Sequence, residues 1–172
     1  MIVDGYWRKE LSSSRLKLNL WSFFNQVIQT KRFEHSINKE ILFSAVVIRK
    51  IIEDDKIARA EIRQNKMKEP GFELVKYRVP IRTYPFIGDE LWISHKVSVE
   101  DYDNESAQEI KLDLDILCNK IIHSYIWSIV YLGKKTYGVG FASDKEKVEK
   151  LYLLKMSDWI DTLQFCINEA NV

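Results

Sequence analysis

A periodic run of apolar residues between Ile37 and Ile62 is the feature that most constrains the fold of this chain. The apolar members recur at three- and four-residue spacing: Ile41, Leu42, Ala45, Val46, Ile48, Ile51 and Ile52. This spacing places them on one broad face of a helix, which other elements must cover. We therefore predict a long helix over 37–62, with Ser36 as its N-cap, at the centre of a helical bundle.

Three other segments have the same helical periodicity. The first covers residues 16–33 and follows a run of serines at 12–14 that could cap it. The others cover residues 106–123 and 157–169. Together with the helix over 37–62, these segments predict a helical bundle.

The segment 65–103 has a different character because helix-breaking residues punctuate it. These breakers are Pro70, Gly71, Pro80, Pro85 and Gly88. A long helix is excluded at that density, and only residues 72–79 and 91–94 have the composition of short extended pieces. We expect an irregular insertion that lies over the bundle.

Residues 125–155 carry three short runs rich in β-branched and aromatic side chains, separated by turn residues. The runs cover 125–132, 136–141 and 151–154. This pattern predicts a three-stranded antiparallel meander. The expected fold is therefore mainly α (α+β): a single domain over 1–172, with a helical bundle, a C-terminal three-stranded sheet and an irregular insertion.

Composition restricts the classes of function. The 172 residues carry a formal charge of +1, from 26 basic and 25 acidic side chains, so contact with nucleic acid would need a local basic patch. Two cysteines cannot form a disulfide framework, and three scattered histidines show no metal-ligand spacing, so no metal or cofactor is expected. No run is apolar enough to span a bilayer and no secretory signal is evident, which predicts a cytoplasmic protein without membrane contact.

The nine residues 117–125 hold the best candidate site. If this stretch is helical, Asn119 and His123 are four residues apart and project from the same face. Leu114, Leu117, Ile121 and Ile122 supply the apolar stripe that would hold the helix against its neighbours.

An Asn–x3–His–small–Tyr pattern at the end of an apolar helix resembles the signature of the HEPN superfamily, in which an arginine usually precedes the asparagine. Asn119, His123 and Tyr125 match that pattern, whereas Cys118 stands where the arginine is expected. The resemblance implies a HEPN-like antiparallel bundle, a homodimer through the motif helix, and metal-independent ribonuclease chemistry. A family member of this kind would be of a defence or toxin–antitoxin type.

The residue types suit that chemistry. A histidine can move protons near neutral pH during attack of a ribose 2′-hydroxyl on phosphate, and Asn119 can orient His123 or the phosphate. An arginine would hold the phosphate with two donors, which the neutral thiol of Cys118 cannot do. The resemblance therefore implies weakened or lost cleavage, with Arg49 or Lys120 as candidate phosphate contacts and Tyr125 as an accessory residue.

Two other interpretations remain open. His123 and Asn119 can be structural, the first bonded to backbone at a helix end and the second packed with satisfied partners. The chain would then be a non-catalytic dimeric interaction or regulatory module that binds a protein partner. Alternatively, Asn119 and His123 can line a pocket for a nucleotide or another small molecule rather than for RNA.

Overall fold

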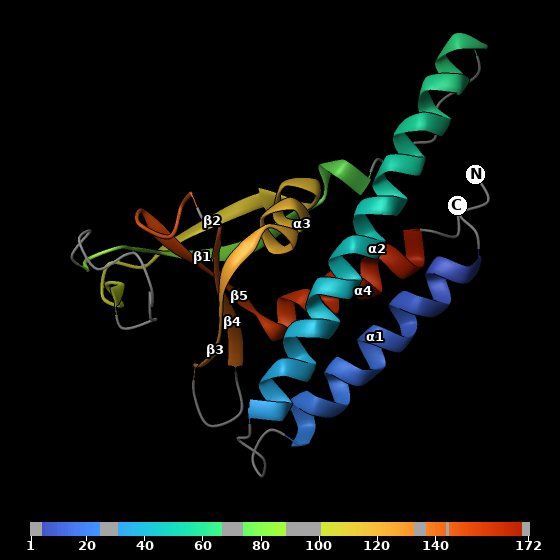
Figure 1. The fold of residues 1–172 in the computed structure, drawn as a ribbon. Coiled ribbons are helices and arrows are strands. Elements are labelled where there is room, and N and C mark those ends of the chain that lie inside the picture. Colours follow the sequence, from blue (N-terminus) through green and yellow to red (C-terminus); the bar gives the residue numbers. More distant parts are fainter. Residues whose placement is uncertain are drawn as a thin grey trace.

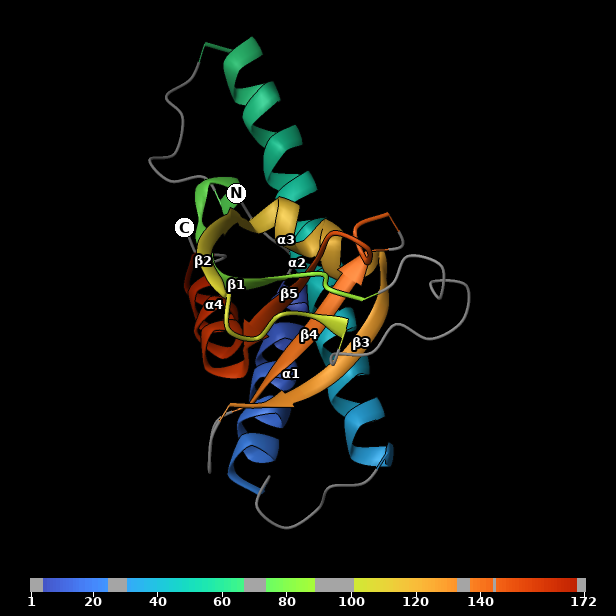
Figure 2. The same ribbon diagram turned by 90° about the vertical axis from the view of Figure 1, so that its left-hand side faces the viewer.

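The structure, a computed structural model, describes residues 5–24, 31–66, 74–88, 101–132, 137–143 and 145–169. In these residues, helices α1, α2 and α4 cover one face of a five-stranded antiparallel sheet (Figures 1 and 2). The elements in chain order are α1 (Gly5–Phe24), α2 (Lys31–Gln64), a 3₁₀ turn (Leu74–Lys76), β1 (Arg78–Pro85), β2 (Gln108–Asp113), α3 (Leu114–Ile122), β3 (Ser124–Tyr131), β4 (Tyr137–Ser143), β5 (Lys150–Lys155) and α4 (Met156–Glu169).

The predicted fold class is wrong, because the sheet has five strands in the order β2-β1-β5-β4-β3 rather than three. Strand β1 belongs to the segment 65–103, which was predicted as an irregular insertion over the bundle. Its Pro80 and Pro85 break helices but are tolerated near strand ends and beside unpaired backbone. Side chains alternate along it, with Val79, Ile81 and Thr83 buried on the helix-facing side.

Strand β2 corrects the helix predicted over 106–123, whose first part is extended; only Leu114–Ile122 is helical. In β2, Ile110 and Leu112 pack against the core, while Lys111 between them is exposed. An apolar pair spaced like Ile110 and Leu112 is too short to define a strand period. Because Leu114 is four residues after Ile110, the same residues also fit the apolar face of a helix. The sheet pairing of β2 with β1 decides between the two.

The first two helices also begin earlier than predicted. Helix α1 starts at Gly5 because Trp7 and Leu11 extend the apolar face of Leu18 by about three turns, and the serines at 12–14 lie inside it. Helix α2 starts at Lys31, so Ser36 is not its N-cap. Residues 25–30 of the helix predicted over 16–33, and the extended piece predicted at 91–94, lie outside the described residues.

A chain of hydrogen bonds ties three helices together within the core. The indole Nε1 of the fully buried Trp159, on α4, donates to Ser44 Oγ on α2 (3.1 Å), and the Ser44 hydroxyl donates to the carbonyl of Glu40 (2.8 Å). The Glu40 carboxylate accepts a bond from Ser14 Oγ of α1 (2.5 Å) and pairs with Lys17 (3.2 Å). These polar groups are satisfied by one another, so their burial does not leave an unpaired donor or acceptor.

The face of the sheet opposite the helices carries a smaller apolar cluster. Its buried members are Tyr84, Tyr102, Ala142, Leu151 and Leu153. Tyr102 is held there by a β-bridge between its own backbone and Phe86, and by a bond from its hydroxyl to the carbonyl of Lys147 (2.6 Å). None of the described helices is both long and apolar enough to cross a bilayer.

Close approach of β4 and β5 generates a first prediction. A Cβ added at Gly138 would lie 2.8 Å from the Leu154 carbonyl oxygen and 2.9 Å from Leu153 Cδ1. We expect Gly138→Ala to lower the free energy of unfolding by about 1–3 kcal/mol, because the strands must separate. The matched control is Gly140→Ala, whose nearest contact is Leu151 Cδ2 at 3.2 Å. Denaturant titrations that show Gly140→Ala to be the more damaging change would contradict this account.

Candidate functional site: the α2–α3 seam

Helix α3 carries the motif and passes directly into β3. Its buried residues are Leu114, Leu117, Cys118 and Ile121, and they form the apolar stripe that packs it into the core. Asn119 lies on the helix, and His123 is its C-cap, with its backbone N–H donating to the Asn119 carbonyl (3.0 Å). The two motif residues are therefore one turn apart, with Asn119 half-buried and His123 exposed.

Helix α3 packs against α2, the helix that carries Arg49. Lys56 of α2 pairs with Asp115 of α3 (3.1 Å). Arg49 lies two turns before Lys56 on the same face of α2, about 10 Å along its axis, and His123 lies about 12 Å after Asp115. From these offsets we infer that Arg49 lies near the C-terminal part of α3, which carries Asn119 and ends before His123. We call the surface formed by Arg49, Asn119 and His123 the α2–α3 seam.

The electrostatics of Cys118 support the same placement. Burial raises the pKa of the Cys118 thiol well above its ordinary value, nearby Cys166 and Asp115 raise it further, and the charge of Arg49 opposes them. Cys118 is completely buried, so the thiol is protonated and cannot contact a phosphate. The side chain at the position where the motif would have an arginine therefore lies in the core. Arg49, on the neighbouring helix α2, is the cation whose charge acts on it.

Three polar groups along the seam have open hydrogen-bonding capacity. Arg49 Nε donates to Glu53 Oε1 (3.1 Å), but its two terminal nitrogens form no hydrogen bond with another described residue. The side-chain amide of Asn119 and the imidazole of His123 likewise make no hydrogen bond within the described part of the chain. The seam thus offers a guanidinium, an amide and an imidazole to a ligand or to solvent.

Lys120, in the last turn of α3, is engaged in a separate polar cluster. Its Nζ donates to Glu146 Oε1 (2.6 Å), which also accepts a bond from the Tyr152 hydroxyl (2.8 Å). Ser143 Oγ donates to Glu146 Oε2 (2.9 Å), and the Lys120 ammonium lies 4.6 Å from the centre of the Tyr152 ring. Lys120 is therefore committed to Glu146, whereas Arg49 acts electrostatically on Cys118 of the same helix; contact of Arg49 with Asn119 or His123 stays a prediction. Tyr125 lies in β3, and its side chain is outside the described residues.

Sequence reasoning placed Glu146 only in a turn and missed its role in this cluster. A local signal was present, since Ser143 and Glu146 have the S-x-x-E spacing of a capping box. The Glu146 backbone N–H does bond to Ser143 Oγ (3.3 Å). The partnership with Lys120 has no sequence signal, because 26 residues separate the two side chains.

The Glu146 cluster generates a second prediction, on pH. Burial alone would raise the pKa of Glu146, but bonds from Lys120, Tyr152 and Ser143 outweigh it and lower the pKa below the ordinary 4.5. A carboxyl whose pKa is lower in the folded state stabilises the fold above its unfolded pKa. The free energy of unfolding should therefore fall as pH drops below about 4.5.

In the Glu146→Gln variant, this part of the pH dependence should disappear, and stability at pH 7 should drop by about 1–2 kcal/mol because Lys120 loses its charged partner. Urea titrations at pH 7 and at several values below 4.5 measure both effects. Glu149→Gln, in the same turn but exposed, is the matched control. If the two variants behaved alike, the cluster would have no special role in stability.

Comparison with known proteins adds no family to this picture: no protein-family model, curated protein or solved structure matches the chain. Among the described residues, no group of three or more histidine, cysteine, aspartate or glutamate side chains is placed to hold a metal ion. The geometry of the α2–α3 seam and the motif residues therefore carry the functional argument.

Proposed function

We propose that the α2–α3 seam contacts RNA phosphates and that the protein is a weak, metal-independent endoribonuclease that uses HEPN-like chemistry without the predicted bundle fold. The observation that carries the proposal is the juxtaposition of Arg49 with the motif helix. It supplies a guanidinium on the neighbouring helix, whereas the motif itself has a buried cysteine. Asn119 and His123 lie one turn apart at the end of that helix.

The proposed reaction needs a base, a phosphate clamp and an orienting group. His123 takes the proton of a ribose 2′-hydroxyl, whose oxygen attacks the adjacent phosphorus. The bond to the 5′-oxygen breaks, the products are a 2′,3′-cyclic phosphate and a 5′-hydroxyl, and the leaving oxygen takes its proton from water. The terminal nitrogens of Arg49 stabilise the charge on the phosphate oxygens, while the Glu53 contact to Nε holds the guanidinium plane. Asn119 bonds a phosphate oxygen.

Two features of the seam support slow cleavage rather than fast cleavage. Arg49 and Glu53 are both partly exposed, with 38% and 49% of their side-chain surfaces accessible, so water screens the field at the phosphate. The Glu53 carboxylate also offsets part of the charge of Arg49.

A third prediction tests the enzyme. We expect the protein to cleave single-stranded RNA in the presence of EDTA, and His123→Ala to lower the rate at least about 100-fold, as for loss of a general base. Arg49→Gln should lower it at least about tenfold, because one charge-assisted phosphate contact is lost. His35→Ala removes the other exposed histidine among the described residues, and it should leave the rate unchanged.

The melting temperature of each variant is measured together with its cleavage rate. Because His123 and Arg49 are not buried, we expect their variants to unfold near the melting temperature of the parent. No cleavage by the parent over varied RNAs, or equal rates for His123→Ala and His35→Ala, would defeat the nuclease proposal. Cys118→Arg is not a useful test of restored activity, because it would place a guanidinium in the fully buried core.

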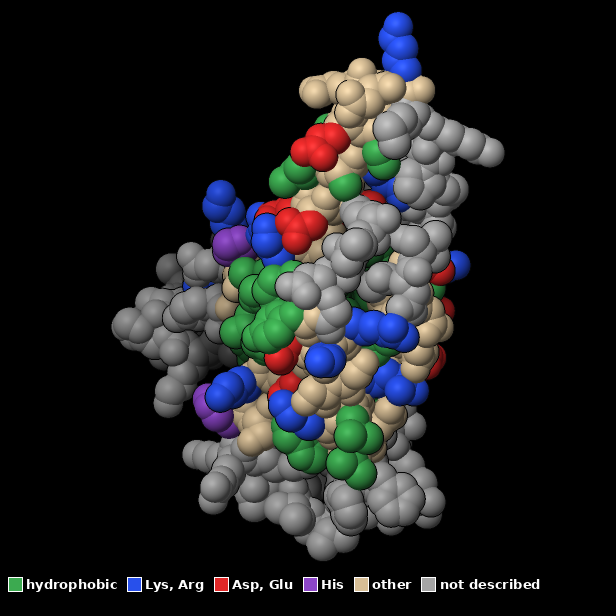
Figure 3. All heavy atoms as spheres, turned by 90° about the vertical axis from the view of Figure 1, so that its right-hand side faces the viewer, with side chains coloured by type: hydrophobic (Ala, Val, Ile, Leu, Met, Phe, Trp, Pro, Cys, Tyr) green, Lys and Arg blue, Asp and Glu red, His purple; other side chains and the backbone are tan. Residues whose placement is uncertain are grey.

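A second candidate function is a non-catalytic interaction module, and one observation favours it. Leu42, Phe43 and Val46 are neighbours on α2 and leave 38%, 41% and 47% of their surfaces exposed. Figure 3 shows apolar side chains gathered on the face along which α2 runs. Exposed apolar clusters of this kind are typical of protein–protein contacts. On α3 itself only Ile116 adds an exposed apolar side chain, so a homodimer through the motif helix would also use this part of α2.

Sedimentation velocity distinguishes this candidate. A dimer or a complex that uses α2 should dissociate in Val46→Glu, because a charge would then be buried in the contact. Lys56→Glu, on α2 near α3, tests whether the contact extends past the seam. A parent that stays monomeric at 100 micromolar, roughly the concentration at which a weak dimer forms, would rule out the homodimer.

A cytoplasmic location belongs to the same proposal. Cys118 and Cys166 are both free thiols and both buried, which suits a reducing compartment.

A further inference from the structure

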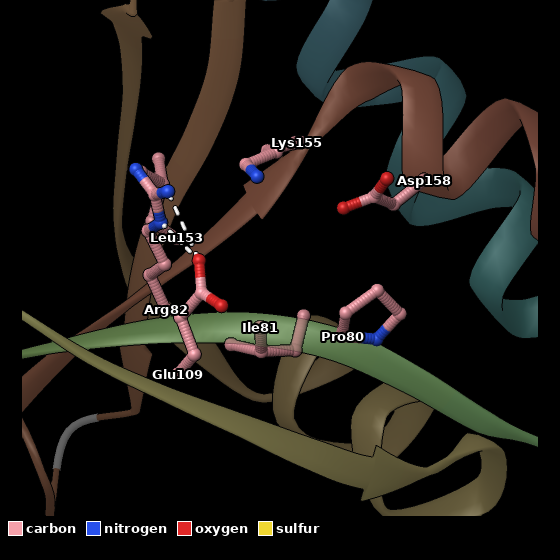
Figure 4. A pocket seen from close by; sticks show the side chains of 7 residues that line it. All are labelled: Pro80, Ile81, Arg82, Glu109, Leu153, Lys155 and Asp158. Carbon is pink, nitrogen blue, oxygen red and sulfur yellow. Dashed lines mark hydrogen bonds and ion pairs between the residues drawn. The ribbon is translucent and has the colours of Figure 1, made fainter.

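A small hollow lies at the junction of β1, β2 and β5 with the start of α4, on the sheet face that carries the Tyr84 cluster. Its volume is about 150 Å³, and its lining residues are Pro80, Ile81, Arg82, Glu109, Leu153, Lys155 and Asp158. None of the three residues of the α2–α3 seam contributes to it. Figure 4 shows four charged side chains around this space.

The hollow follows from the lengths of two neighbouring strands. Pairing between β1 and β5 begins at Arg82 opposite Leu153, although β1 itself begins at Arg78. Strand β5 ends at Lys155, where the chain turns into α4. The first part of β1 therefore has no strand beside it on this edge, and Pro80 has no N–H that would need one.

Of the charged groups around the hollow, only Arg82 and Glu109 form an ion pair with each other. Arg82 Nε and Nη2 both donate to Glu109 Oε1 (3.0 Å each), which leaves Oε2 of Glu109 uncommitted. Lys155 has no carboxylate within 4 Å among the described residues. Asp158 Oδ1 accepts a long bond from Ser157 (3.4 Å) and forms no ion pair with another described residue. Figure 4 shows Lys155 and Asp158 directed into the same space.

We propose that this hollow binds a small zwitterion, a free α-amino acid with an apolar side chain. The carboxylate of the ligand would bond to Lys155, with Arg82 nearby, and its ammonium group would bond to Asp158. The apolar part would lie on Pro80 and Leu153. A volume of this size holds a molecule about as large as benzene, which matches a small amino acid and is too little for a nucleotide.

Each charge also has a structural explanation that the test must separate from binding. Asp158 lies in the first turn of α4, where a carboxylate stabilises the positive end of the helix dipole. Lys155 can project into water without a ligand. A structural role predicts effects on stability alone, whereas a binding role predicts that a ligand needs both of its charges.

L-valine and two of its fragments serve as the probes, with the intact chain. 3-Methylbutanoate lacks the ammonium group and 2-methylpropylamine lacks the carboxylate. Titration calorimetry and the NMR methyl shifts of Leu153 should show that L-valine binds at least about tenfold more tightly than either fragment, because each charged contact contributes separately. Binding by L-valine no tighter than by the fragments would overturn the proposal.

Two conservative variants locate the site. Lys155→Gln and Asp158→Asn should each weaken L-valine binding about tenfold. The control is Lys111→Gln, an exposed lysine on β2 that does not line the hollow and should leave binding unchanged. If the control weakened binding as much as Lys155→Gln did, the attraction would be a general charge effect and the proposal would fail. Melting temperatures, and the unliganded Leu153 methyl shifts, establish that each variant is folded.

Discussion

The hydrogen bond from Trp159 to Ser44 fixes α4 against α2, and the rest of the structure depends on α2 being held in that way. A buried indole N–H without an acceptor would cost the fold an unpaired donor. Ser44 accepts that bond while donating to the Glu40 carbonyl, so the backbone of α2 itself anchors the large ring. Because the Glu40 side chain also contacts α1, one turn of α2 positions both neighbouring helices.

The opposite side of α2 supports α3, which gives the candidate site its geometry. Most charges along this part of α2 are paired: Arg49 with Glu53, Lys50 with Asp54, and Lys56 with Asp115. The surface therefore carries little net charge, in agreement with the overall charge of +1. A site of this kind attracts RNA weakly at long range, so any recognition must come from short contacts to the exposed imidazole, amide and guanidinium groups.

Sequence periodicity was sufficient for the long helix, because Ile41, Ala45, Ile48 and Ile52 mark its buried face whatever packs there. It was not sufficient for β1 and β2. Prolines in β1 suggested an irregular segment, whereas Pro80 lies where β1 has no partner on one edge. Strand β2 has too few apolar residues to distinguish its period from that of the adjoining helix, so only its pairing with β1 reveals it.

The site shows the same division between local and long-range information. The spacing of Asn119 and His123 follows from one turn of helix, and Arg49 could be named as a candidate. Its position beside Cys118 depends on the antiparallel packing of α2 and α3, which no spacing in the sequence encodes. The link between Lys120 and Glu146 and the hollow beside Pro80 likewise arise from segments that the sheet brings together.

His123 is the single residue between the end of α3 at Ile122 and the start of β3 at Ser124. Its backbone N–H bonds to the Asn119 carbonyl of α3, and Ser124 directly after it pairs with Ser143 of β4, although β3 then has a bulge between Ser124 and Ile126. A movement of β3 against β4, or a rotation of α3, would therefore move the backbone of His123. An insertion of even one residue here would separate the end of α3 from the start of β3 and so change where the backbone of His123 lies relative to Asn119.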